Sequence, residues 1–275
     1  MIKLITDTAS LFTPEEAKSL GFISNPLIIN INGKSYEEFT QLNDKQLLEE
    51  IKKGHLPTSS QPSLGKIMDA IEENINDDII LLSMADGLSG TYQTCLSAAN
   101  HFENAKVHVI NSKTLCGPQK YLVEKILESI KNNDNIDTIL KMIHEKIDSI
   151  ESFLLPNDFN YLKRGGRCTP IAAALGGLLK LQPVVKQTAD GKRLDKFATS
   201  RSFDLAIKKI ISHYEGKLDK HIVYISHAFA SENAEKAKKM FEDKFKNIEI
   251  NILELSCAFI TQGGPGCLAI QSIKK

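Results

Sequence analysis

The sequence predicts an α/β protein of two domains: an N-terminal parallel-sheet α/β/α domain and a C-terminal mixed-sheet α/β domain. In the first half, short apolar runs alternate with helical patterns, which is typical of a parallel sheet covered by helices. In the second half, a hairpin signal at Asp190-Gly191 stands among further helices and strands, which indicates a mixed sheet. A chain of 275 residues accommodates two such domains, and we place them at residues 1–151 and 152–275.

The N-terminal elements follow from apolar periodicity and from capping signals. Thr13-Pro14-Glu15-Glu16 fits a capping box with proline at the first helical position, and Asn43 with Gln46 starts a second helix. Asn32-Gly33 is a hairpin signal. The expected strands cover residues 2–6, 25–36, 79–84 and 106–111, and the expected helices begin near residues 14, 43, 63, 90, 120 and 136.

The C-terminal elements are more varied. A short helix over 158–167 ends at Gly165-Gly166, and a small-residue apolar helix follows over 171–181. The hairpin occupies residues 183–200. The other expected elements are strands over 152–157, 221–228 and 250–255, and helices over 202–216 and 232–246.

Composition narrows the class of protein. Lys plus Arg and Asp plus Glu both number 34, so the net charge favours neither nucleic acid nor a membrane as partner. Five cysteines without a CxxC pair indicate reduced thiols, and seven scattered histidines indicate no metal site. Without a leading apolar segment or a run of 18 apolar residues, we expect a cytoplasmic protein with no membrane span and at most transient membrane contact.

Charge is nevertheless uneven along the chain. Between Tyr161 and His221 there are thirteen Lys or Arg residues against five Asp or Glu residues. This segment is a candidate basic face, and the alternative is a solvated surface balanced by acidic neighbours in space.

Polar segments follow several of the predicted strands. Three of them, Thr6–Ser10, Ser83–Gln93 and Asn111–Thr114, come directly after an apolar run, and a fourth, Pro57–Ser63, precedes a helix. Ligands of parallel α/β sheets bind at the carboxyl ends of strands. Small hydroxyls without a visible general base favour anion binding over catalysis.

Ser89 admits three interpretations. As a nucleophile it would need the GxSxG pattern, which fails at Thr91. As a helix cap it would need Glu or Gln at position 92, where Tyr92 stands, whereas Gly90 with Gln93 fits the capping-box register. The third interpretation, a ligand-binding hydroxyl at the electropositive start of a helix, stays open beside the cap.

Six motifs in order, ITDTAS, TSSQPS, GLSGTYQ, INSKT, YLKRGGR and TQGGPG, resemble the motif series of the DegV family along essentially the whole chain. The resemblance implies a two-domain carrier that binds one long-chain fatty acid between its domains, as the subunit of a bacterial fatty acid kinase (FakB-like). A separate ATP-dependent kinase subunit would phosphorylate the bound carboxyl to an acyl phosphate for phospholipid synthesis. The carrier itself would have no catalytic residue and no cofactor besides the bound fatty acid.

By position, the resemblance implies a carboxylate site on two motifs. Ser89, beside Gly90, would hydrogen-bond the carboxylate. Ser59, beside Thr58, stands where the family has threonine, so the hydroxyl is kept and a methyl is lost. Arg201 would lie near the carboxyl or at the kinase docking surface.

The remaining implied residues lie in the basic and closing motifs. Arg164 and Arg167 of KRGGR would dock the kinase. Gln262 stands where the family usually has histidine; it can donate a hydrogen bond to a carboxylate, but it cannot move a proton near neutral pH. We expect this exchange to affect phosphorylation more than binding.

A fatty acid also needs an apolar tunnel. Burying about 14 methylenes is worth roughly 11 kcal/mol before the costs of association. The expected tunnel wall is the small-residue helix, through Ala172, Ala173, Ala174, Gly176 and Gly177, and ordinary helix packing is the alternative. Two other functions stay open: a freestanding serine hydrolase using Ser89, and a regulatory module for another small anion.

Overall fold

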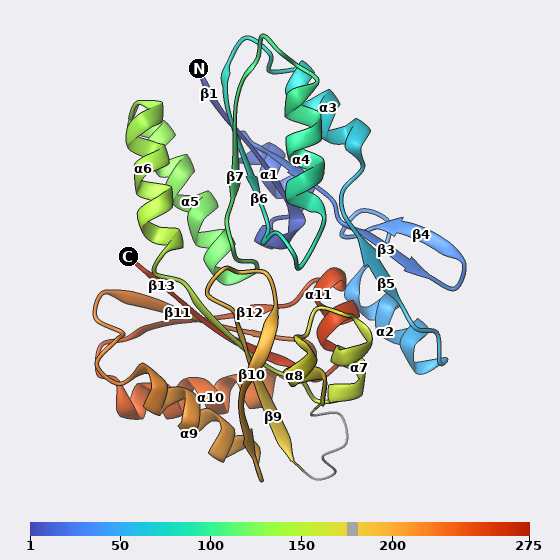
Figure 1. Ribbon diagram of the computed structural model, residues 1–275, viewed down its shortest axis with the longest axis vertical. Helices are drawn as coiled ribbons and strands as arrows, with labels where there is room; N and C mark the ends of the chain where they lie inside the picture. Colours follow the sequence, from blue (N-terminus) through green and yellow to red (C-terminus); the bar gives the residue numbers. More distant parts are fainter. Residues whose placement is uncertain (175–180) are drawn as a thin grey trace. The chain divides into compact units, whose positions relative to one another are not determined.

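The chain forms two compact units. The computed structural model describes residues 1–174 and 181–275 (Figure 1). The first unit comprises Met1–Ile147 together with Ser256–Ala258, and the second comprises Asp148–Leu255 and Phe259–Lys275. The division therefore differs from a single boundary at residues 151 and 152, because three residues of the C-terminal half belong to the first unit.

The first unit contains a four-stranded parallel sheet, as expected. Its strands are β1 (Ile2–Asp7), β2 (Ile23–Asn25), β6 (Asp78–Ser83) and β7 (Lys106–Asn111), in the order β2-β1-β6-β7. Neighbouring strands are all parallel, with Leu4 opposite Ile80 and Ile79 opposite Val107. Their carboxyl ends therefore lie at one edge of the sheet, where the polar segments begin.

Helices cover both faces of this sheet. Figure 1 shows α3 and α4 on one side and α5 and α6 on the other. Ile5, Ile79 and Leu81 pack with apolar residues of α3 and α4 in one cluster, and each is at most 1% exposed. A fully buried side chain of this kind contributes about 1.5–3 kcal/mol. The helices of the unit are η1 (Thr8–Ser10), α1 (Pro14–Ser19), α2 (Asp44–Lys52), α3 (Leu64–Glu72), α4 (Thr91–Asn100), α5 (Gly117–Lys131) and α6 (Ile136–Ile147).

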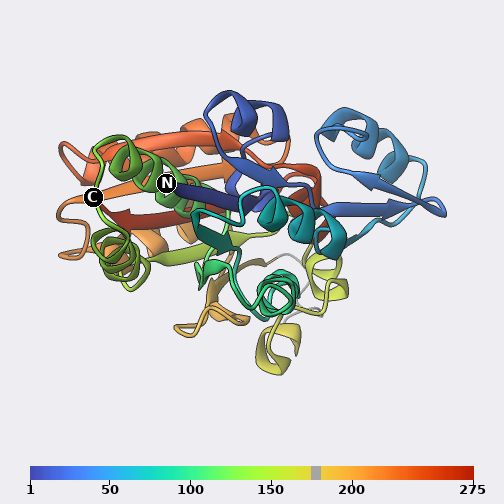
Figure 2. The same cartoon turned by 90° about the horizontal axis from the view of Figure 1, so that it is seen from above.

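The segment predicted as extended over 25–36 with a turn at Asn32-Gly33 does form a hairpin. The hairpin forms at Asn32-Gly33, with φ of 51° and 71°, but it joins β3 (Ile28–Ile31) to β4 (Lys34–Glu37) in a separate antiparallel sheet of order β4-β3-β5. Figure 2 shows this small sheet and α2 to one side of the parallel strands. The edge strand beside β1 is β2, which has only three residues, too few for a clear apolar pattern.

The second unit contains the expected mixed sheet. Its six strands have the order β10-β9-β8-β13-β11-β12, and only β11 and β12 are parallel. The strands are β8 (Glu151–Leu155), β9 (Gln182–Gln187), β10 (Leu194–Ser200), β11 (His221–His227), β12 (Glu249–Glu254) and β13 (Leu268–Lys274). The hairpin β9–β10 turns where it was predicted, with Gly191 at φ 77°.

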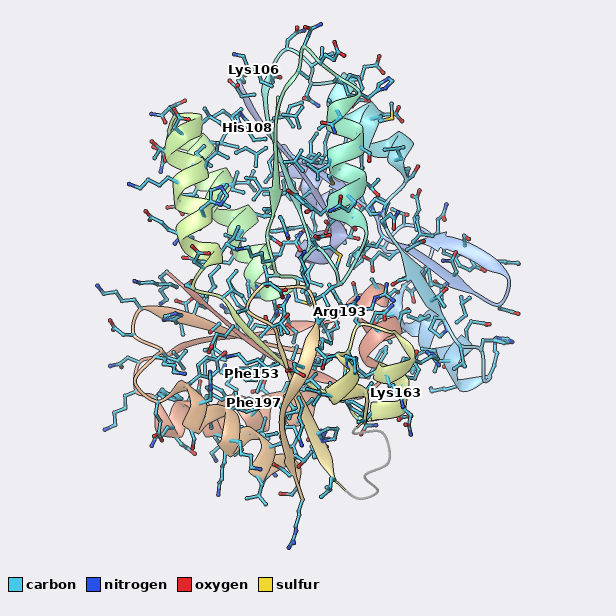
Figure 3. All side chains as sticks on the ribbon, viewed as in Figure 1. Lys106, His108, Phe153, Lys163, Arg193 and Phe197 are labelled. Carbon is cyan, nitrogen blue, oxygen red and sulfur yellow. The ribbon has the colours of Figure 1, made fainter. Side chains whose placement is uncertain are left out.

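One apolar cluster joins this sheet to α9 (Phe203–Tyr214) and α10 (Ser231–Lys244). Phe153 of β8 and Phe197 of β10, both labelled in Figure 3, pack edge to face with ring centroids 4.8 Å apart. Tyr214 of α9 also packs edge to face on Phe153, with ring centroids 5.5 Å apart, so aromatic contacts hold α9 on the sheet.

Three short helices complete the second half of the chain: α7 (Phe159–Arg164), α8 (Pro170–Ala173) and α11 (Cys257–Gly263). Helix α11 was not predicted. Of the expected tunnel wall, Gly176 and Gly177 lie outside the described residues. None of the helices in the described part of the chain is long and apolar enough to cross a membrane.

Candidate functional site

Three polar segments meet at the carboxyl edge of the parallel sheet. β1 ends at Asp7, β6 at Ser83 and β7 at Asn111. The segments after β6 and β7 are joined by hydrogen bonds: the Ala85 N–H donates to the Thr114 carbonyl at 2.8 Å, and the Asp86 N–H donates to Asn111 Oδ1 at 3.2 Å. The expected clustering of these segments is therefore found within the first unit.

Most side-chain hydroxyls of these segments donate hydrogen bonds to main-chain carbonyls. Thr6 Oγ1 donates to the Leu82 carbonyl at 2.7 Å, Ser10 Oγ to the Asp7 carbonyl at 2.8 Å, and Ser112 Oγ to the Thr114 carbonyl at 3.2 Å. All three side chains are buried. Their role is structural, which removes them from the candidates for ligand contact and leaves the half-buried hydroxyls.

Ser89 is one of these half-buried hydroxyls, directly before α4. Its Oγ accepts the Thr91 N–H at 3.3 Å and lies 2.8 Å from Thr91 Oγ1. Gly90 is the N-cap, as the register predicted, but Gln93 bonds Asp86 Oδ1 at 3.4 Å, so the expected capping box does not form. The Ser89 oxygen is thus partly used at the helix start. When the Thr91 hydroxyl donates to it, the Ser89 O–H remains a donor for a ligand.

The polar segment Pro57–Ser63 contains a short strand, and its other residues are loop. Thr58–Ser60 form β5, which pairs antiparallel with β3 and places Ser59 opposite Ile29. Gln61 then lies against the start of α4: a Cβ added to Gly90 would stand 2.9 Å from Gln61 Oε1. This contact brings the Ser59 motif and the Ser89 motif together, and only a residue without a side chain at position 90 allows it.

The sequence analysis missed a pair of buried carboxylates beneath this edge. Asp7 is 2% exposed and accepts the Met84 N–H at 2.8 Å, the Ala9 N–H at 3.0 Å and Gln119 Nε2 at 3.1 Å. Burial raises the pKa of Asp7 to about 6, against the lowering effect of these hydrogen bonds. Asp7 lies in the ITDTAS motif, and this motif was the sequence signal that could have identified it.

Glu38, the second carboxylate, has no exposed surface. It accepts hydrogen bonds from Thr8 Oγ1 and, at 2.9 Å, from the Ala258 N–H in the first turn of α11. Burial raises its pKa to about 7, and the nearby charge of Asp7 adds to the rise. Its bond to Ala258, with that of Cys257 Sγ to the Leu42 carbonyl, joins Ser256–Ala258 to the first unit. No sequence motif marked Glu38.

In the second unit, the closing motif packs on the KRGGR turn. The Gln262 side chain of α11 lies against Gly165, where an added Cβ would collide with its Oε1. Gly264, at φ 81°, lies under the ring of Tyr161, where an added Cβ would be 3.0 Å from Cδ1. The Thr261 hydroxyl is buried and has no hydrogen-bond partner among residues 1–174 and 181–275. Gln262 and the basic motif therefore pack against each other within this unit.

The predicted arginines are divided among different elements of this unit. Arg164 of α7 stacks on Tyr161, with its guanidinium carbon 4.1 Å from the ring centroid. Arg167 follows the Gly165-Gly166 turn and donates to the Gly165 carbonyl. Arg201 is exposed next to Ser202, the N-cap of α9, and forms no hydrogen bond or ion pair with the described residues.

The family model described as "Uncharacterised protein, DegV family" matches residues 1–275, the whole chain. The chain belongs to the DegV family. A DegV domain-containing protein of Staphylococcus aureus (strain N315) is 28% identical over 279 residues, which cover 99% of this chain and 98% of the relative.

Two solved structures of the DegV family share the fold closely. The fatty acid binding DegV family protein from Streptococcus agalactiae has a TM-score of 0.91 at 25% identity, over 100% of this chain and 99% of its own. DegV, a fatty acid binding protein from Bacillus subtilis, has a TM-score of 0.87 at 27% identity, again over 100% and 99%.

The Ser89 hydroxyl of this DegV-family chain is able to donate a hydrogen bond but, in the part of the chain that the structure describes, has no base beside it. No histidine or carboxylate of the described residues bonds the Ser89 hydroxyl, whose partners are both on Thr91. A serine nucleophile needs an adjacent base to remove its proton. The hydroxyls of Ser59 and Ser89 instead suit an acceptor such as a carboxylate oxygen.

Proposed function

We propose that this DegV-family protein binds one long-chain fatty acid and anchors its carboxylate on the Ser59 and Ser89 hydroxyls. The observation that carries this proposal is the packing of Gln61 on Gly90, which joins the two hydroxyl motifs at the start of α4. Two relatives with nearly superimposable folds, from Streptococcus agalactiae and Bacillus subtilis, are described as fatty acid binding proteins.

The start of α4 supplies favourable electrostatics for this anchor. The first N–H groups of a helix are unpaired within the helix and point toward an incoming anion. The N-cap, Gly90, has no side chain to bond these groups, and Ser89 Oγ accepts only the Thr91 N–H, at 3.3 Å. Thr58 precedes Ser59 on β5 and is exposed, which places a further hydroxyl in the same motif.

We further propose that the protein presents the fatty acid carboxyl to a separate ATP-dependent kinase subunit, which forms an acyl phosphate for phospholipid synthesis. Arg164, Arg167 and Arg201 are the proposed docking residues, and Gln262 donates a hydrogen bond to the reacting carboxyl. In this scheme the DegV-family chain is a carrier with no catalytic residue of its own. The exposed positions of Arg164 and Arg201 support a docking role.

The binding proposal is tested with delipidated protein and oleate. Ser89→Ala and Ser59→Ala are each expected to weaken oleate binding about tenfold, because a hydrogen bond to a charged group is worth about 1.5–3 kcal/mol. Ser97→Ala is the matched control: its hydroxyl lies on α4, but it is exposed and donates to the Gln93 carbonyl. Native mass spectrometry counts the lipid per chain, and a wild-type protein that takes up no fatty acid would overturn the proposal.

The partner proposal needs its own measurement. With a fatty acid kinase subunit and ATP, the loaded protein is expected to yield an acyl phosphate, trapped with hydroxylamine as a hydroxamate. Gln262→His should raise this yield if the missing proton-transfer group limits the reaction. The kinase role is contradicted if wild type and Gln262→His both bind oleate normally but neither gives a hydroxamate. That result would leave the fatty acid binding proposal intact.

A further inference from the structure

Two arginines of the second unit stand together beside the Gly165-Gly166 turn. Arg167 Nη1 donates to the Gly165 carbonyl, and Arg193 Nη1 donates to the Gly166 carbonyl at 3.0 Å. Two guanidinium groups are therefore fixed on consecutive carbonyls of one turn. Figure 3 labels Arg193 between β9 and β10, and Lys163 on α7 before the turn.

The backbone holds this arrangement in register. The Leu194 N–H donates to the Arg167 carbonyl at 3.0 Å, and the Thr169 N–H donates to the Leu194 carbonyl at 2.8 Å. These two bonds form a short parallel bridge between Cys168 and Leu194. Arg167 directly precedes Cys168, and Arg193 directly precedes Leu194. The main-chain hydrogen bonds of the bridge therefore set the spacing of the two arginines, in addition to their side-chain rotamers.

The electrostatics of the pair favour an added negative charge. Arg167 is half-buried, and its pKa is lowered first by burial and then by the neighbouring charge of Arg193. The two nearby acids have other partners: Asp195 accepts from the Thr169 hydroxyl, and Asp190 from the Thr188 hydroxyl and the Lys192 N–H. Arg193 is exposed and forms no ion pair with the described residues.

The turn itself leaves room for a ligand. Gly166 has φ 74°, and a Cβ added to it would meet no atom within 4 Å. The side of the turn away from the packed Gly165 is therefore open. Arg193 gives one N–H to the Gly166 carbonyl, and a guanidinium carries five N–H donors in a planar fork that matches the oxygens of a phosphate.

We propose that Arg167 and Arg193 form a binding site for a phosphate dianion over the Gly165-Gly166 turn. The ligand is a phosphate group carried by a small molecule or by a lipid headgroup. The site goes beyond the proposed fatty acid function, which assigns no role to Arg193 and takes its carboxylate anchor from Ser59 and Ser89.

The test measures binding of inorganic phosphate and of pyrophosphate by calorimetry at low salt, with wild-type protein and three variants. Arg193→Ala is expected to weaken binding at least tenfold, and Arg193→Lys to give an intermediate loss because the charge stays but the fork is lost. Lys196→Ala is the matched control, since it removes one exposed positive charge from the adjacent β10 and should change binding less than twofold.

A second arm separates the two sources of the phosphate. Vesicles containing phosphatidic acid, whose headgroup is a phosphate monoester, should retain wild-type protein but not Arg193→Ala if the group belongs to a lipid headgroup, and vesicles of phosphatidylcholine alone should retain neither. Binding of the free anions with no vesicle retention assigns a small molecule. The proposal is overturned if neither probe binds, or if Lys196→Ala loses as much affinity as Arg193→Ala. Oleate binding, measured in parallel, is expected to be equal in all variants, so this result is independent of the fatty acid proposal.

Discussion

At the scale of single residues, Gly90 is the clearest case of a position in the first unit that only glycine fits. Its φ of −73° is open to any residue, so the requirement for glycine comes from Gln61. Gly90→Ala is expected to push the Gln61 amide away and to separate the two hydroxyl motifs, with weaker oleate binding and a stability change of at most about 1 kcal/mol.

A double-mutant cycle checks this cause. In Gln61→Ala, the space that the Gly90→Ala methyl needs is vacant, so the double variant should bind oleate better than the sum of the single losses predicts. Additive losses would mean that Gly90 matters for another reason, such as access of the ligand to the helix start.

Glu38 makes a prediction about pH. Its pKa in the folded protein is about 7, above its ordinary value of 4.5, so the folded state holds the proton more tightly than the unfolded state between these values. The free energy of unfolding therefore falls as pH rises from 4.5 to 7, by at most about 1.4 kcal/mol per pH unit, and Glu38 adds no further slope above 7.

Glu38→Gln should remove this part of the slope. Denaturant unfolding at pH 5, 6, 7 and 8 measures it, with Glu72→Gln, an exposed carboxylate of α3, as the control. Asp7, with a pKa of about 6, leaves a residual slope at lower pH in both variants. An unchanged profile between pH 6 and 7 in Glu38→Gln would show that this carboxylate does not titrate there.

At the scale of elements, helix caps were the most predictable feature. Thr13 with Glu16 and Asn43 with Gln46 form the two capping boxes that the sequence indicated, with all four hydrogen bonds between 2.8 and 3.1 Å. Such local signals are readable because both partners lie within one turn of the chain. Helix α11 escaped prediction because its first turn is bonded by Glu38, which is 220 residues away in sequence.

This contrast between caps gives a test of what Ser89 does. Asn43→Ala should lower the unfolding free energy by about 1 kcal/mol, because it removes a full cap. Ser89→Ala should cost less, since Ser89 accepts one longer bond of 3.3 Å from Thr91 and precedes the N-cap. Chemical denaturation of both variants without fatty acid compares them, and a larger loss in Ser89→Ala would favour a structural role over ligand binding.

For the whole molecule, the fold class followed from the order of elements, whereas long-range pairings did not. The alternation of strands with helices predicted the parallel sheet. It could not show that the Asn32-Gly33 hairpin pairs with β5 in a separate sheet. The hydroxyl motifs were readable as candidates, but Gln61, Asp7 and Glu38 act through contacts of more than 20 residues in separation. Such contacts leave no periodic signal in one sequence.

Ligand binding should also be visible in the stability of the whole chain. A fatty acid at 100 times its dissociation constant stabilises the state that binds it by about 2.7 kcal/mol. Thermal unfolding of delipidated protein is therefore expected to shift upward with oleate, in proportion to the logarithm of its concentration. The double variant Ser59→Ala, Ser89→Ala keeps the apolar surfaces and loses both proposed carboxylate anchors, so its shift should begin at oleate concentrations higher by about 100-fold.

Methyl oleate has the acyl chain without the charge, so it separates the contribution of the chain from that of the carboxylate. It should stabilise wild type and the double variant alike. A shift from oleate that is the same in both proteins would place the carboxylate on other residues.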